Sequence, residues 1–135
     1  MTSYQQLLEK QRAFFATGKT RDREVRIEQL NKLRQVVIEK HKDIEKSLYQ
    51  DLNKCEFEAF VTEVTAIIDE ITCAVDNLES WTKPVEVATS SLFGQAESKY
   101  HYEPYGTVLL LNTWNYPFVL CFKPLVGALA AGNCC

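Results

Sequence analysis

Residues 107–112 limit the choice of fold more than any other part of this chain. Their sequence, Thr-Val-Leu-Leu-Leu-Asn, is a nearly continuous apolar run of strand length, typical of a parallel strand buried on both faces. A short polar loop follows, and then an apolar helix is predicted, because Pro117 suits a first helical turn and Gly132 can end a helix. Strand, loop and helix predict the opening of a parallel α/β unit whose second strand comes after the helix.

A strand of this kind needs more cover than one helix provides. Unpaired strand edges invite aggregation, so residues 107–112 require neighbouring strands that the sequence up to Cys135 does not supply. We therefore expect this strand and its helix to present a contiguous apolar surface in the isolated chain. The side chains expected on that surface are Val108, Leu109, Leu110, Phe118, Phe122, Leu125 and Leu129.

Residues 1–84 are predicted to form a helical region. A first helix is expected up to a stop at Gly18, and a second from 20 to 52 with one apolar and one charged side. A third helix is expected to run until Pro84, because the residue before a proline disfavours the helical conformation. Its apolar positions recur at helical spacing: Phe57, Phe60, Val61, Val64, Ile68, Ile71, Val75 and Leu78.

Residues 85–106 differ in residue composition from the helical region. Residues 85–94 are rich in small side chains and predict a loop, whereas the aromatic content of 99–102 favours a strand. Glu103-Pro104-Tyr105-Gly106 predicts a turn. The chain thus divides into a helical region (1–84), a loop with an arm strand (85–106) and an incomplete strand–helix unit (107–135).

Composition excludes several classes of function. A net charge of −3 without a basic face argues against nucleic-acid binding. No apolar run is long enough to span a bilayer and the N-terminus does not resemble a signal peptide, so we expect a cytoplasmic protein. The 5 cysteines and 2 histidines match no zinc-binding spacing, so no metal site is expected.

The sequence Thr-Trp-Asn-Tyr-Pro-Phe at 113–118 is the candidate functional motif. In α/β sheets, ligands bind beyond the carboxyl ends of the strands, which is where this loop is expected. The Asn115 amide could stabilise an oxyanion without titrating, an effect that contributes roughly 3 kcal/mol to a transition state. A turn asparagine next to a core tryptophan, Trp114, explains the same residues without any catalytic role.

A longer stretch carries a family resemblance. Glu-Pro-Tyr-Gly-Thr-Val-Leu-Leu-Leu-Asn-Thr-Trp-Asn-Tyr-Pro-Phe, followed by Pro-Leu-Val-Gly-Ala-Leu-Ala-Ala-Gly-Asn, resembles the aldehyde dehydrogenase superfamily, and most closely its class 3 branch with the fatty aldehyde dehydrogenases. Glu-Phe-Glu-Ala at 56–59 and Trp-Thr-Lys-Pro at 81–84 are also similar to that branch. The resemblance implies an α/β fold in which N-terminal helices and a β-arm precede a Rossmann-like NAD-binding domain. It also implies oxidation of aldehydes to carboxylic acids with NAD or NADP as cofactor.

The resemblance assigns roles to five residues of this sequence. Asn115 would be the side-chain donor of the oxyanion hole. Thr113 and Trp114 would lie against the nicotinamide of NAD(P), while Tyr116 and Leu120 would line the path of the aldehyde.

The resemblance also places two catalytic groups outside this sequence. The family's nucleophilic cysteine and its general-base glutamate would both follow Cys135, and Cys121 matches neither of them. The chain by itself is therefore expected to be inactive. The complete enzyme is expected to be a homodimer, with residues 99–102 in the arm that makes dimer contacts.

Two other interpretations are compatible with parts of the sequence. Three amphipathic helices could form a non-catalytic interaction module, or the chain could be a regulatory short isoform that poisons full-length dimers. Residues 107–132 discriminate against the first, because an interaction module has no use for a buried parallel strand followed by a Trp-Asn loop.

Overall fold

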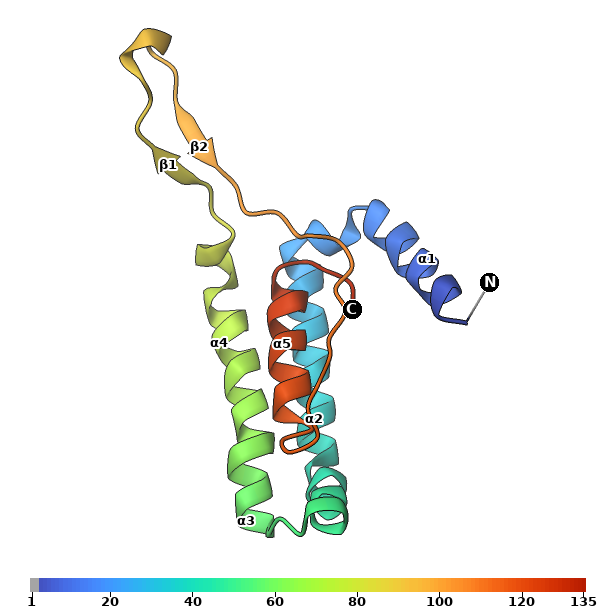
Figure 1. The fold of residues 1–135 in the computed structure, drawn as a ribbon. Coiled ribbons are helices and arrows are strands. Elements are labelled where there is room, and N and C mark those ends of the chain that lie inside the picture. The colour runs from blue at the N-terminus through green and yellow to red at the C-terminus, as the bar shows by residue number, and fades with distance from the viewer. Residues whose placement is uncertain (1–2) are drawn as a thin grey trace.

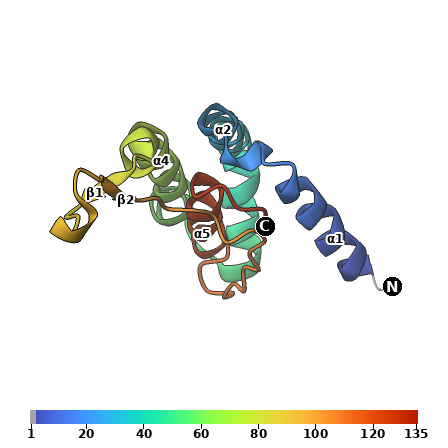
Figure 2. The same ribbon diagram turned by 90° about the horizontal axis from the view of Figure 1, so that it is seen from above.

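Three long helices packed side by side form the body of the protein (Figure 1). The computed structural model describes residues 3–135. Helix α5 (Val119–Ala130) packs against both α2 (Arg23–Leu52) and α4 (Ala66–Trp81), and the view from above shows it beside both of them (Figure 2). The core among these helices consists of Leu30, Val37, Ile44, Leu48, Ala59, Val64, Ile67, Ile71, Ala74, Leu78, Val126 and Ala130.

The first two helices follow the sequence prediction closely. Helix α1 (Ser3–Ala16) stops just before Gly18, whose φ of 76° is a left-handed conformation that glycine adopts without strain. A 3₁₀ turn and the N-cap Asp22 precede α2, and the Asp22 carboxylate accepts a hydrogen bond of 2.8 Å from the Glu24 N–H. Helix α2 ends at Leu52 as predicted, with Asn53 in the left-handed region.

The predicted third helix contains a wider turn that the sequence analysis did not anticipate. It consists of α3 (Glu56–Ala59), a π-helical turn at Phe60–Thr65, and α4. The predicted apolar face is wrong at Phe57, Phe60 and Val61, which are 78%, 40% and 44% exposed, whereas Val64 within the turn is buried as predicted. The reason is that a π turn adds backbone to the helix, so residues on its two sides are rotated relative to a regular helical pattern.

An antiparallel hairpin projects away from the helices (Figure 1). Strand β1 (Val85–Val87) pairs with β2 (Ser98–Tyr100), and Val87 lies opposite Ser98. The predicted loop at 85–94 is thus wrong at its start. The partner of the predicted strand precedes it in the chain, at Val85–Val87. No turn is assigned at 103–105, which are irregular, and the chain bends at Gly106.

Residues 107–112 do not form the predicted strand buried on both faces. Only Thr107 makes a parallel bridge, with Cys134, supported by a 2.8 Å hydrogen bond from the Val108 N–H to the Cys134 carbonyl. Leu109 and Leu111 are 80% and 87% exposed. The physical reason is that no other part of residues 3–135 lies beside this segment as a strand.

Helix α5, in contrast, is better covered than expected. It begins two residues after Pro117, at Val119, and Phe118, Phe122 and Leu129 pack against the core. The prediction that these three side chains belong to an exposed apolar surface is wrong: they are half-buried, because α5 packs against α2 and α4 within this chain. Of the seven side chains predicted on the exposed apolar surface, only Leu109 is classed as exposed.

Candidate active site

The five predicted site residues lie in and just after the loop that joins residues 107–112 to α5. Thr113, Trp114 and Asn115 are exposed, Tyr116 is half-buried, and Leu120 is 42% exposed in the first turns of α5. Trp114 is 79% exposed, so the alternative of a core tryptophan is wrong for this chain. We call residues 113–118 the site loop.

A buried carboxylate holds the end of the site loop. Glu63, at 0% exposure, lies on the π-helical turn, and its Oε2 accepts hydrogen bonds from the backbone N–H groups of Phe118 and Val119, at 2.8 and 3.3 Å. Helix α5 has no side-chain cap of its own. Glu63 therefore satisfies N–H groups at the start of α5 and places a negative charge at the positive end of its dipole.

A buried lysine neutralises this carboxylate. The Lys54 ammonium group pairs with Glu63 Oε1 and lies 3.6 Å from the ring centroid of Tyr116, which is a cation–π arrangement. Lys54 is 7% exposed. Removing one member of a buried pair leaves an uncompensated charge, which costs about 3–5 kcal/mol. Lys54, Glu63 and the site loop thus form one connected unit, and the lysine and the loop meet through Tyr116.

Local backbone structure explains why these charged residues point inward. Lys54 follows directly after Asn53, whose left-handed conformation ends α2 and redirects the chain. Glu63 has its inward position on the π-helical turn, where Val64 is also buried. Sequence reasoning missed both residues. The available signal was a glutamate placed between Val61 and Val64, within the apolar stretch of the third helix.

The opposite end of α5 is fixed by a second set of contacts. The Arg26 guanidinium donates to the carbonyls of Thr20 at 2.7 Å, Arg21 at 2.9 Å and Ala130 at 3.2 Å. Asn133 Oδ1 accepts a hydrogen bond of 2.8 Å from the Gly106 N–H. Helix α5 is therefore held at both ends, which leaves the site loop little freedom where it meets the helix.

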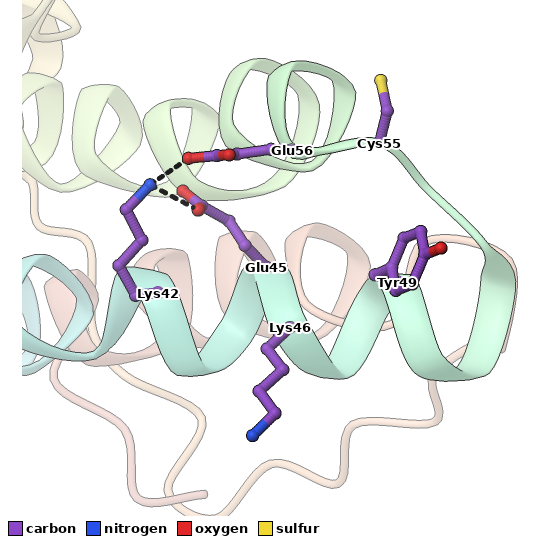
Figure 3. Close-up of a pocket in the computed structure, with 6 residues that line it drawn as sticks. All are labelled: Lys42, Glu45, Lys46, Tyr49, Cys55 and Glu56. Atoms are coloured by element: carbon purple, nitrogen blue, oxygen red, sulfur yellow. Dashed lines mark hydrogen bonds and ion pairs between the residues drawn. The ribbon is translucent and has the colours of Figure 1, made fainter.

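A surface pocket at the C-terminal part of α2 contains none of the predicted site residues. Figure 3 shows Lys42 pointing at two carboxylates, those of Glu45 and Glu56, with Cys55 nearby. The hydrogen bond to Glu56 raises the pKa of Lys42, and the same contact lowers the pKa of Glu56. Each partner thus stabilises the charged form of the other, so this cluster is an ion-pair network without a group prepared for proton transfer.

No group of three or more metal-ligating side chains comes together among the described residues. No helix of the described chain is long and apolar enough to cross a membrane.

Comparison with known proteins gives a consistent result. The model of the aldehyde dehydrogenase family matches residues 2–135. The chain is 39% identical over 133 residues to the dimeric NADP-preferring aldehyde dehydrogenase of Canis lupus familiaris, which covers 98% of this chain and 29% of the relative. It is 42% identical over 135 residues to aldehyde dehydrogenase family 3 member B1 of Bos taurus, covering 99% of this chain and 29% of the relative.

A solved structure agrees with these relatives. The substrate-bound state of Staphylococcus aureus AldH superposes with a TM-score of 0.95 at 41% sequence identity, covering 98% of this chain and 29% of that chain. The chain therefore spans less than a third of the length of the proteins it matches. Because the family model and the structure both match almost every residue, the chain belongs to the aldehyde dehydrogenase family, with class 3 members among its homologues and its match in their N-terminal part.

Proposed function

We propose that this chain is the N-terminal part of an NAD(P)-dependent aldehyde dehydrogenase that oxidises aldehydes to carboxylic acids, and that Asn115 supplies an oxyanion-hole donor to it. The observation that carries this proposal is the position of Asn115. Its amide is exposed in a loop whose helical end is held by the buried Glu63. A neutral donor held in place can stabilise negative charge that develops on a carbonyl oxygen.

The exposed residues before Asn115 fit a nicotinamide cofactor. The Trp114 indole, 79% exposed, offers a planar apolar face, and the exposed Thr113 hydroxyl offers a hydrogen-bonding group next to it. These two residues would hold the nicotinamide of NAD or NADP, which accepts a hydride when bound. In this proposal, Thr113 and Trp114 orient the ring and exclude water from one of its faces.

Tyr116 and Leu120 are proposed to line the aldehyde path. The Tyr116 ring is fixed on the Lys54 ammonium group, and Leu120 presents an apolar side chain in the first turn of α5. They thus flank Asn115 on its helical side with apolar surface. An aldehyde carbon chain would be desolvated against them while its oxygen faces the amide.

The domain division and the assembly are part of the same proposal. Residues 1–84 form its helical region, 85–106 its arm and 107–135 the start of its NAD(P)-binding domain. One relative is named a dimeric enzyme, and the hairpin β1–β2 projects from the body with both strands largely exposed. We propose that this hairpin contacts the second subunit of a homodimer.

The proposal is tested in the full-length enzyme that carries this segment. Asn115→Ala is expected to lower kcat by roughly a hundredfold or more, because the amide stabilises charge that exists only in the transition state. Cofactor affinity should change little. Asn112→Ala, which removes another exposed amide near the site loop, serves as the control and should keep kcat. A large rise in cofactor Kd with unchanged kcat would show instead that Asn115 positions NAD(P).

A further inference from the structure

We propose that Glu63 is a positioning residue that orients Asn115 through the first turn of α5, with Lys54 balancing its buried charge. This inference rests on the proposed role of Asn115 as an oxyanion donor. It assigns the direction of the Asn115 amide to a buried ion pair on the helices packed against α5, outside the loop that carries the amide.

The backbone around Asn115 determines where its side chain lies. Within residues 3–135 the Asn115 side chain makes no hydrogen bond, so its direction depends on the backbone that carries it. That backbone is fixed immediately downstream. Lys54 contacts the next residue, Tyr116, and Glu63 binds the N–H groups of Phe118 and Val119.

The Glu63 carboxylate binds Lys54 and the start of α5 at the same time. Glu63 uses Oε1 for Lys54 and Oε2 for the start of α5, so neither oxygen can shift without disturbing the other contact. Because the pair is almost fully buried, water cannot easily replace either bond. The site loop is thereby connected to the π-helical turn and to the end of α2 together.

Glu63 offers the site loop a hydrogen-bond acceptor, which is distinct from its negative charge. The site loop contacts the hydrogen-bond acceptor, Oε2, while the charge of Oε1 is balanced by Lys54. Loss of the acceptor should therefore release the loop even when no unpaired charge is left behind. Loss of the charges alone, with an acceptor retained, should leave the loop held.

This distinction gives a matched pair of double variants in the full-length enzyme. In Lys54→Met/Glu63→Leu both charges and the acceptor are removed, whereas Lys54→Met/Glu63→Gln removes the charges but keeps a carbonyl oxygen for the N–H groups of Phe118 and Val119. Apolar replacement of a complete buried pair is often tolerated, so both proteins are expected to fold. We expect the leucine variant to lose about ten- to a hundredfold in kcat, because small misplacements of a catalytic group are costly. The glutamine variant should retain most of it, and cofactor Kd should be similar in both.

A third comparison shows whether the effect passes through Asn115. In an Asn115→Ala background, the leucine double variant should lower kcat little further, since there is no amide left to misplace. The ion pair between Lys123 of α5 and Glu70 of α4, at 3.2 Å and about 40% exposed, provides the control. Glu70→Gln should leave kcat unchanged in every background.

The outcomes separate this inference from the proposed function. If Asn115→Ala itself leaves kcat unchanged, the oxyanion role fails, and the positioning role fails with it. If Asn115→Ala lowers kcat but the leucine double variant does not, the positioning role alone is overturned. Equal losses from the leucine variant with and without Asn115 would likewise overturn it, because the ion pair would then act independently of the amide.

Discussion

Helix α4 and the segment 107–114 both carry large apolar side chains but differ sharply in their burial. In the helices, Ile67 and Ile71 are 0% exposed, whereas Leu109, Leu111 and Trp114 in the segment are at least 79% exposed. A helix satisfies its backbone hydrogen bonds internally and needs only one covered face, which two neighbouring helices provide here. A strand needs neighbours for its backbone as well as for its side chains. Helices α2, α4 and α5 thus cover one another, while the segment has no neighbouring strand among residues 3–135.

The largest expected effect concerns catalysis by the 135-residue chain alone. We expect no detectable oxidation of aldehydes with NAD or NADP, because covalent catalysis requires a nucleophile, and the relatives carry more than two thirds of their length outside the matched region. Absorbance of the reduced cofactor measures this directly. Turnover above a buffer blank that disappears on thiol alkylation would show that one of the five cysteines here is a competent nucleophile. It would contradict the prediction that the 135-residue chain is inactive by itself.

The next effect contrasts the two regions by the same type of substitution. Ile71→Ala should lower the free energy of unfolding of this chain by roughly 2–5 kcal/mol, because it leaves a cavity in the core. Leu111→Ala should change it by less than about 0.5 kcal/mol, since its side chain is 87% exposed. Urea denaturation measures both values. In the full-length enzyme we expect Leu111→Ala to become clearly destabilising, because further strands would then cover it.

A smaller effect concerns the C-terminal end of α5. Gly132→Ala should destabilise the chain by about 1–3 kcal/mol, because a left-handed backbone disfavours other residues and the added Cβ would lie 2.7 Å from the Thr20 carbonyl oxygen. Gly127→Ala is the matched control within α5. No atom lies within 4 Å of its new Cβ, so helix propensity should stabilise the chain by roughly 0.5–1 kcal/mol. Equal effects at both positions would contradict a tight contact at Gly132.

The smallest effect is a pH dependence at the surface pocket. Hydrogen bonding to Lys42 lowers the folded-state pKa of Glu56 below its ordinary value of 4.5. Its contribution to stability is therefore present above about pH 4.5 and is lost as the pH falls through the lower folded-state pKa. Glu56→Gln should accordingly reduce the loss of stability on acidification in this range. Chemical denaturation of both proteins at a series of acidic pH values measures the difference, and identical slopes would argue against the effect.

Residue patterns predicted the helices far better than the segments between them. The end of α1 before Gly18 and the end of α2 at Leu52 follow from local helix propensity and hydrophobic periodicity, which can be read from the sequence alone. The hairpin was half predicted, because three residues of β1 are too few for a clear alternation. The π-helical turn was not foreseeable from a 3.6-residue period, and it determines which side chains of the third helix face inward.

The candidate site was predicted in its exposed residues and missed in its buried ones. Asn115 and its neighbours were found through a family resemblance, and their catalytic roles stay predictions. Glu63 was not found, because a single acidic residue in a helix is usually solvated. Only the three-dimensional contact between the π-helical turn and Phe118 shows that its carboxylate caps another helix.

The bridge between Thr107 and Cys134 has a consequence for the order of folding. Parallel pairing is slow because a long connection must close before any ladder forms. Here α5 packs onto the other helices and Cys134 lies beside Thr107, so docking of α5 would close this connection without a complete sheet. A strand that continued from Cys135 would start in a fixed register along residues 108–111. The helical part of the chain would thus act as a template for the sheet, and the rate of sheet assembly would depend on how stably α5 is docked.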